Sequence, residues 1–128
     1  MLKTIEQLHR RGIVHSDIKP DNILYSEVER SYMLIDFGLS CLLDSQEDHL
    51  KPTTSKCLGF SSLNKMMGGQ VSFIDDWVCL LYSLINLLKG SLPWINKQHV
   101  SKEAYLKQNL AMKEDPQIIL DYISDARC

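Results

Sequence analysis

The sequence predicts a mostly α-helical domain with one small β-hairpin. Residues 74–88 form a long stretch with apolar side chains on almost every face of a helix, as expected for a helix in a protein core. Residues 2–8 carry apolar side chains at three-residue steps, which indicates one face of an amphipathic helix ended by Gly12. Residues 23–25 and 32–35 are short apolar runs separated by a polar segment, and this pattern predicts two paired strands.

Length and composition are those of an ordinary globular chain. The 128 residues suffice for one modest domain, and 45% hydrophobic with 23% charged residues is typical of a soluble fold. The net charge of −2 gives no basic field, so we expect neither nucleic acid nor an anionic membrane as a partner. The longest apolar run is too short to span a bilayer, and the charged N-terminal segment is not a signal peptide.

The cysteine pattern predicts a reducing environment. The four cysteines form no Cys-x-x-Cys pair, and they combine with none of the four histidines at zinc-like spacing. We therefore expect thiols rather than disulfides or a zinc site, in the cytoplasm or the nucleus.

The rest of the chain predicts one irregular segment and more helix. Residues 39–59 are mixed in character, which indicates a surface loop. Ser72 and Asp75 form a capping-box pattern at the start of the long apolar helix, and Gly90 is suited to end it. Residues 116–123 are rich in apolar side chains and predict a last packing helix.

Two motifs before the middle of the chain carry the chemistry. The first begins with two apolar residues and then places Asp17, Lys19 and Asn22 on one loop. The carboxylate can accept a hydroxyl proton, the ammonium can neutralise a moving phosphoryl group, and the amide oxygen can bind a hard cation. Residues 36–38 form the second motif, in which Asp36 is followed by Phe and a Gly hinge. These residue types suit phosphoryl transfer.

The two motifs, in this order and at this separation, resemble the catalytic loop and the magnesium loop of eukaryotic protein kinases. The resemblance implies the mostly helical large lobe (C-lobe) of a protein kinase, with the small β-hairpin at the catalytic cleft. Residues 1–128 would form a partial protein kinase domain. It would run from the end of the first long large-lobe helix to near the penultimate helix.

The implied activity is transfer of the γ-phosphoryl group of ATP to a Ser or Thr hydroxyl of a protein substrate. Asp17 would orient and deprotonate the hydroxyl, and Lys19 would stabilise the transferred charge, so these two are the predicted catalytic residues. Asn22 and Asp36 would hold the Mg²⁺ that bridges the ATP phosphates, as metal ligands and cofactor-binding residues. Asp76, early in the long helix, would accept hydrogen bonds from backbone amides of the catalytic loop.

One kinase group is closer than the others. Residues 60–64 (Phe-Ser-Ser-Leu-Asn) resemble the Tyr-Ala-Ser-Ile-Asn segment of the casein kinase 1 group, where most kinases carry Ala-Pro-Glu. This group includes the vaccinia-related and tau-tubulin kinases. Further segments that resemble it are residues 75–76, 92–94 and 119–123. The Lys-Pro pair at residues 19–20 looks like the serine/threonine type rather than the tyrosine type.

Two positions depart from the usual kinase pattern. Ser16 stands where most kinases have an Arg that pairs with a phosphorylated residue of the activation loop, so control through that pair is not expected. Lys56 and Cys57 stand where the family usually has Gly-Thr. That Thr bridges the catalytic Asp and Lys, and a thiol is a poor substitute. Residues 39–59 would correspond to the activation loop.

Parts that cover and orient the ATP phosphates are not found in the sequence. No G-x-G-x-x-G loop and no strand lysine precede His15. We therefore expect that the small lobe is absent and that the chain alone is incomplete and inactive. A lobe without its cover would expose an apolar face, for which we expect a partner protein. Two alternatives stay open: a catalytically dead, kinase-like binding module, and a truncated gene remnant.

Overall fold

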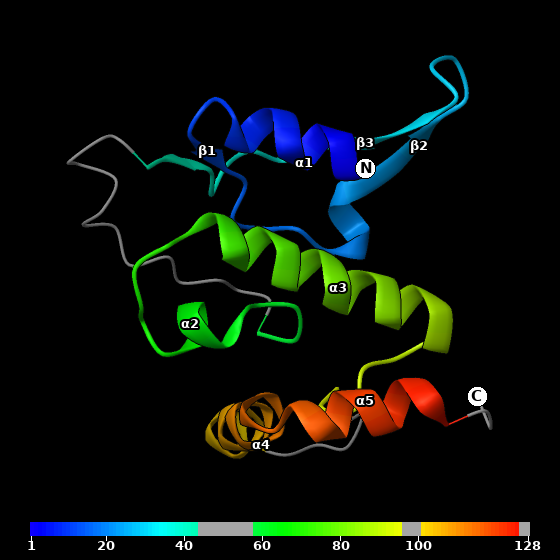
Figure 1. Cartoon of the computed structure of the whole chain (residues 1–128). Coiled ribbons are helices and arrows are strands. Elements are labelled where there is room, and N and C mark those ends of the chain that lie inside the picture. The colour runs from blue at the N-terminus through cyan, green and yellow to red at the C-terminus, as the bar shows by residue number, and fades with distance from the viewer. Residues whose placement is uncertain (44–57, 96–100, 126–128) are drawn as a thin grey trace.

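The computed structural model describes residues 1–43, 58–95 and 101–125. Figure 1 shows helix α3 running through the middle of the molecule, with α1 and the strands on one side and α2, α4 and α5 on the other. The helices are α1 (Leu2–His9), the 3₁₀ turn η1 (Pro20–Asn22), α2 (Leu63–Met66), α3 (Phe73–Lys89), α4 (Lys102–Glu114) and α5 (Pro116–Ser124). The strands are β1 (Ile13–Val14), β2 (Ile23–Ser26), β3 (Ser31–Leu34) and β4 (Cys41–Leu42). The predicted mostly helical fold is confirmed.

Helix α3 begins and ends where the sequence predicts. The carboxylate of Asp75 accepts a hydrogen bond of 2.7 Å from the backbone N–H of Ser72, the residue that caps the helix. At the other end, Gly90 adopts a left-handed conformation with φ of 77°. Such a conformation is strained for residues with a Cβ atom, so Gly is the residue that ends the helix at low cost.

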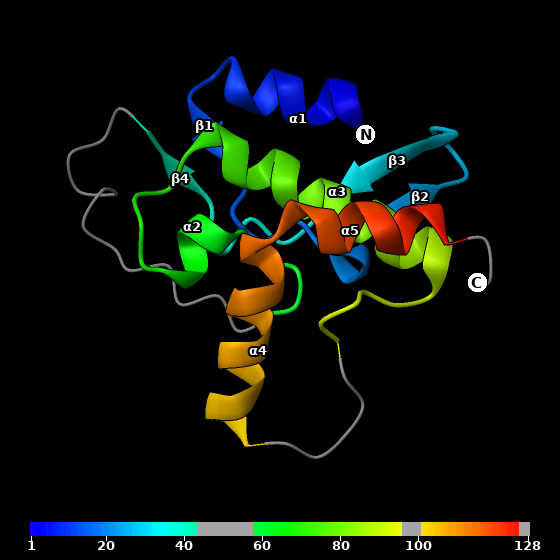
Figure 2. The same ribbon diagram turned by 60° about the horizontal axis from the view of Figure 1, so that its bottom comes forward.

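The core lies on two sides of α3. Cys79 and Leu80 pack with residues of α1, the hairpin and residues 15–22, the loop that resembles the catalytic loop of kinases and is named the catalytic loop below, in a cluster completed by Ile5, Ile18 and Leu34. Tyr82 and Ile85 pack with the segment after the helix, in a cluster completed by Leu92 and Trp94. Figure 2 shows α5 alongside α3, and residues of α5 pack against this second cluster.

A third side of α3 is exposed, which corrects the expectation of a helix buried all round. Ile74, Leu84 and Leu88 are 70%, 44% and 83% exposed, and Trp77 and Leu81 lie on the same side. The apolar pattern is present, but the described segments pack against only part of the helix circumference. The apolar residues on this side of α3 therefore form a surface that the other described residues leave exposed.

The hairpin forms as predicted, and a second strand pair was not predicted. Strands β2 and β3 are antiparallel, with Ile23 opposite Leu34. Strand β4, within the segment expected to be irregular, pairs antiparallel with β1. Each of these strands has only two residues, too few for a periodic sequence signal. Residues 44–57, which hold most of the expected activation loop and the Lys56–Cys57 departure, lie outside the described residues.

Helix α2 was not predicted either. It has four residues and is capped by Ser62, whose side-chain oxygen accepts from the backbone N–H of Lys65 at 3.2 Å. The predicted last helix is confirmed as α5. Among the described helices, none is both long and apolar enough to cross a membrane.

Candidate catalytic site

The loop between β1 and β2 brings three of the predicted site residues together. Lys19 Nζ lies 2.7 Å from Asp17 Oδ2, and Asn22 Nδ2 donates to the same oxygen at 3.0 Å. Asn22 Nδ2 also donates to the backbone oxygen of Asp17 at 2.8 Å. The rigid φ of Pro20 starts the 3₁₀ turn that returns Asn22 toward Asp17. The carboxylate is thus fixed by a cation and an amide, while its side chain stays 10% exposed.

Asp36 follows the other strand of the hairpin. The backbone N–H of Ile35 donates to the backbone oxygen of Asn22 at 3.0 Å, so the two predicted metal ligands are attached to adjacent chain segments. Asp36 has a positive φ of 61°, and its Oδ1 accepts from the N–H of Gly38 at 3.2 Å. The hairpin therefore holds an exposed carboxylate next to the catalytic loop.

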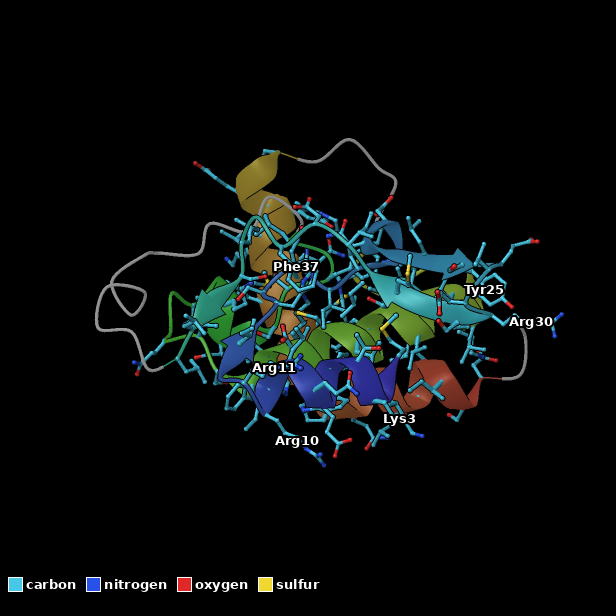
Figure 3. The ribbon with its side chains drawn as sticks, turned by 90° about the horizontal axis from the view of Figure 1, so that it is seen from above. Lys3, Arg10, Arg11, Tyr25, Arg30 and Phe37 are labelled. Carbon is cyan, nitrogen blue, oxygen red and sulfur yellow. The ribbon has the colours of Figure 1, made fainter. Side chains whose placement is uncertain are left out.

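His15 links the two motifs through both nitrogens of its ring. Nε2 is 3.1 Å from the backbone oxygen of Ile35, and Nδ1 accepts from the N–H of Asp17 at 3.3 Å. Phe37, which is labelled in Figure 3, packs against the ring with 4.7 Å between the ring centroids. Burial lowers the pKa of His15 below 6.5, so the neutral ring donates from Nε2 and accepts at Nδ1. Its contacts place His15 between the two motifs.

Asp76 of α3 shapes the start of the loop. Its Oδ2 accepts from the backbone N–H of His15 at 2.8 Å, and its Oδ1 accepts from that of Ser16 at 2.9 Å. The expected contact of this carboxylate with the loop is therefore present, and Asp76 is fully buried. A charge in this position is tolerated because several donors surround it.

His9 is a third partner of Asp76 that the sequence interpretation missed. Its Nε2 lies 2.9 Å from Asp76 Oδ2, and its ring contacts Trp77 edge-on at 5.6 Å. The available signal was its place four residues after buried Ile5, on the inner face of α1. A polar residue on an apolar helix face calls for a buried partner, but sequence spacing alone does not identify the partner.

The donor atoms at the hairpin suit Mg²⁺. Asn22 supplies an amide and Asp36 a carboxylate, and Mg²⁺ in proteins commonly takes one or two carboxylates together with oxygens of substrate phosphates. Within residues 1–43, 58–95 and 101–125, no group of three or more His, Cys, Asp or Glu side chains could hold a metal by itself. An amide and a carboxylate at the hairpin fit a cation that phosphate groups help to bind.

Residues 1–124 match the protein kinase domain. The chain belongs to the protein kinase family. A probable casein kinase I homolog from Encephalitozoon cuniculi is 33% identical over 123 residues, which cover 88% of this chain and 38% of that protein. A casein kinase 1-like protein from Oryza sativa is 30% identical over 133 residues, 92% of this chain and 18% of that protein. Casein kinase I homolog 3 from Schizosaccharomyces pombe is 30% identical over 147 residues, 99% of this chain and 34% of that protein.

These comparisons confirm the predicted lineage. The chain is of protein serine/threonine kinase lineage and is similar to casein kinase 1 homologues, and protein kinases as a family use ATP and Mg²⁺ to phosphorylate proteins. The chain spans only 18–38% of the length of these three relatives. Its match is therefore to part of a kinase, as the sequence predicted.

A buried lysine, Lys113, contacts the segment that resembles the casein kinase 1 group. Lys113 of α4 is 5% exposed, and its Nζ donates to the backbone oxygens of Leu58 and Ser61 at 2.9 and 2.7 Å. The same ammonium lies 5.1 Å from the ring of Tyr82 and 5.0 Å from that of Trp94. Burial lowers its pKa from 10.5 to about 8. Lys113 thus attaches α4 to residues 58–61.

The lowered pKa of Lys113 predicts a pH-dependent stability. Between pH 8 and 10.5 the unfolded chain binds a proton that the folded chain does not, so the free energy of unfolding rises with pH. The slope due to this group is at most about 1.4 kcal/mol per pH unit. Burial raises the pKa of Cys79 from 9.0 to about 11, which acts in the opposite direction above pH 9.

Comparison of the wild-type protein with Lys113→Met separates the contribution of Lys113 to the pH dependence from that of Cys79. Urea unfolding of both proteins from pH 7 to 10.5 should show the wild-type stability rising relative to that of the variant. A stability difference that stays constant over this range would contradict the lowered pKa.

Proposed function

We propose that this chain carries the substrate-side part of the catalytic machinery of a protein serine/threonine kinase. The observation that supports this most directly is the Asp17 carboxylate, held by Lys19 Nζ at 2.7 Å and Asn22 Nδ2 at 3.0 Å. Both contacts use Oδ2, and among the described residues no hydrogen bond engages Oδ1. A hydroxyl of a Ser or Thr substrate would bind at Oδ1.

Asp17 and Lys19 would act together on the substrate. Asp17 would orient the hydroxyl and accept its proton, a contribution of about 10²- to 10⁴-fold for general acid–base catalysis. Lys19 stays next to the reacting oxygen, where its ammonium would stabilise charge on the transferred phosphoryl group. The contact between them also lowers the cost of holding each charge in a half-buried site.

Asn22 and Asp36 would hold Mg²⁺ against the ATP phosphates. The metal would supply neutralisation of the phosphate charge. The chain's own contribution is geometric, because the hydrogen bond between Ile35 and Asn22 keeps both donors at the base of the hairpin. Protein substrate and ATP are the partners that this function requires. We expect no nucleic acid partner, because the net charge of −2 gives no basic field.

We expect that these 128 residues alone transfer no measurable phosphate. Phosphoryl transfer depends on positioning and charge stabilisation, and in kinases a Gly-rich loop and a strand lysine position the ATP phosphates. The site described above contains the acceptor side and the metal side only. The measurement is a radiolabelled ATP assay on the purified chain, with casein as acceptor and Asp17→Asn as the blank. Transfer clearly above that blank would show that this part of the domain suffices.

A kinase-like binding module is the second candidate, and the exposed side of α3 favours it. Ile74, Trp77, Leu81, Leu84 and Leu88 recur at alternating three- and four-residue steps, the spacing of a seam between helices. An uncovered seam of this kind favours association with an apolar surface of another protein. The partner would present a complementary apolar helix face.

The behaviour of the purified chain tests this surface. At micromolar concentrations we expect the chain to elute from a sizing column as an assembly larger than its 14.7 kDa monomer. Leu81→Glu combined with Leu84→Glu should restore the monomer, because both side chains lie on the exposed seam. Val28→Glu is the matched control, since Val28 is 92% exposed at the hairpin turn. If the wild-type chain eluted as a monomer, the proposal that the exposed side of α3 mediates association would be contradicted.

A further inference from the structure

Ser16 has an unusual backbone conformation directly before the proposed base. Its φ is 67°, in the left-handed region that residues with a Cβ atom rarely adopt, and the residue is 2% exposed. Within the described part of the chain, its side-chain oxygen is buried without a hydrogen-bond partner. The side chain therefore does not stabilise this conformation. A strained conformation of this kind persists only when the surroundings hold it.

The two peptide groups that flank Ser16 are each held by a charged side chain. The N–H of Ser16 belongs to the first peptide group, and it donates to Asp76 Oδ1 at 2.9 Å. The carbonyl oxygen of Ser16 belongs to the second, and it accepts a hydrogen bond from Lys65 Nζ. Because each peptide group is planar, fixing both of them fixes the φ and ψ of Ser16.

The second of these peptide groups contains the N–H of Asp17. The plane of this peptide group therefore sets the direction of the backbone at Asp17. The contacts with Lys19 and Asn22 restrain the side chain of Asp17 in addition. The N–H of Asp17 itself points to His15 Nδ1 at 3.3 Å, a long hydrogen bond. Of the contacts on this peptide group, the one from Lys65 is charge-assisted and hence the stronger.

Lys65 is itself held in a defined place. It is 6% exposed and lies on α2, whose capping residue Ser62 donates to Asp75 Oδ1 at 2.5 Å. Asn64, next to Lys65, donates to the carboxylate of Asp75 at 3.1 Å. The two adjacent acids of α3 thus have separate tasks: Asp76 binds the loop directly, and Asp75 binds the helix that carries Lys65.

We propose that Lys65 is a positioning residue for Asp17. It acts through the Ser16 carbonyl, and it contributes a cation at the catalytic loop from a segment 49 residues away. A buried ammonium is costly unless it is paired, so its burial against this one carbonyl indicates a strong contact. The role in catalysis rests on the proposed function, whereas the restraint on the loop does not.

Hydrogen exchange of the full 128-residue chain tests the restraint without ATP. In Lys65→Met, which keeps the length of the side chain and removes its charge, the amides of Ser16 and Asp17 should exchange at least about tenfold faster, because local opening becomes easier. The amides of α3 should keep their wild-type rates. Lys65→Arg should restore slow exchange at Ser16 and Asp17, since it replaces the cation.

Lys113→Met is the matched control. Among the described residues, Lys113 is the other buried lysine that binds backbone oxygens, and it holds Leu58 and Ser61 instead of the catalytic loop. The proposal is overturned if Lys65→Met leaves the amide exchange rates of Ser16 and Asp17 unchanged, or if Lys65→Arg does not restore slow exchange. It is also overturned if Lys113→Met accelerates exchange at these two amides as much as Lys65→Met does.

A second variant covers the case in which Lys65→Met also unfolds α3. Ser62→Ala keeps the Lys65 side chain but removes the cap of α2 and its hydrogen bond to Asp75, so it loosens the helix that holds Lys65 against Ser16. Faster exchange at Ser16 and Asp17 in this variant supports the proposal, and unchanged exchange contradicts it. Neither result depends on kinase activity, so a failure of the proposed function would be recognised separately.

Discussion

Replacing Asp76 by Ala should lower the free energy of unfolding by about 2–5 kcal/mol. The substitution leaves the backbone N–H groups of His15 and Ser16 buried without an acceptor, and each stranded donor costs about 1–3 kcal/mol. His9 loses its buried partner at the same time. Urea unfolding at neutral pH measures the difference.

Asp121→Ala is the control for this experiment. Asp121 lies exposed on α5, where its carboxylate contacts the side chain of Gln117 at 2.7 Å. Changes at exposed sites of this kind usually stay within about 0.5 kcal/mol. If Asp76→Ala proved as mild as Asp121→Ala, the carboxylate would not hold the loop in solution.

Replacing Asp17 by Asn should lower kcat by about two orders of magnitude or more, the scale of lost general base catalysis. The measurement needs a longer protein that binds ATP, for example this chain fused to the small lobe of a related kinase. An amide of the same shape can still contact Asn22, but it cannot accept the hydroxyl proton. In the same protein, Asp36→Asn should weaken Mg²⁺-dependent nucleotide binding instead, because it removes a charged metal ligand.

Asp21→Asn separates the role of Asp17 from a general effect of charge. Asp21 is an exposed carboxylate in η1, four positions along the same segment. Its substitution should leave kcat near the wild-type value. Equal phosphorylation rates for the wild-type protein and Asp17→Asn would refute the assignment of Asp17 as the base.

Features that depend on neighbouring residues were predictable from the sequence. The pairing of Ser72 with Asp75 and the stop at Gly90 involve short spacings with a known physical cause, and both are confirmed. The hairpin likewise follows from two apolar runs and a polar turn. The grouping of Asp17, Lys19 and Asn22 required only one loop, although their roles remain predictions.

Features that depend on distant residues were not predictable in this way. His9 reaches Asp76 across 67 positions, and Lys65 reaches Ser16 across 49. No spacing rule connects such pairs, because only the packing of α1, α2 and α3 brings them together. The exposed side of α3 was missed for a related reason. The apolar pattern shows which faces of the helix are suited to burial, and only the structure shows which of these faces the described residues bury.

The dependence of the catalytic loop on Asp76 also sets an order of events during synthesis. His15 and Ser16 precede their acceptor by 61 and 60 residues. At about 5–20 residues per second, the ribosome needs roughly 3–12 s to add that stretch. Until then the loop cannot close on its partner, and ordering it later requires the closure of a long chain segment. A ribosome that stops before residue 76 would release a polypeptide that contains Asp17, Lys19, Asn22 and Asp36 yet has no means of shaping the loop that holds the first three.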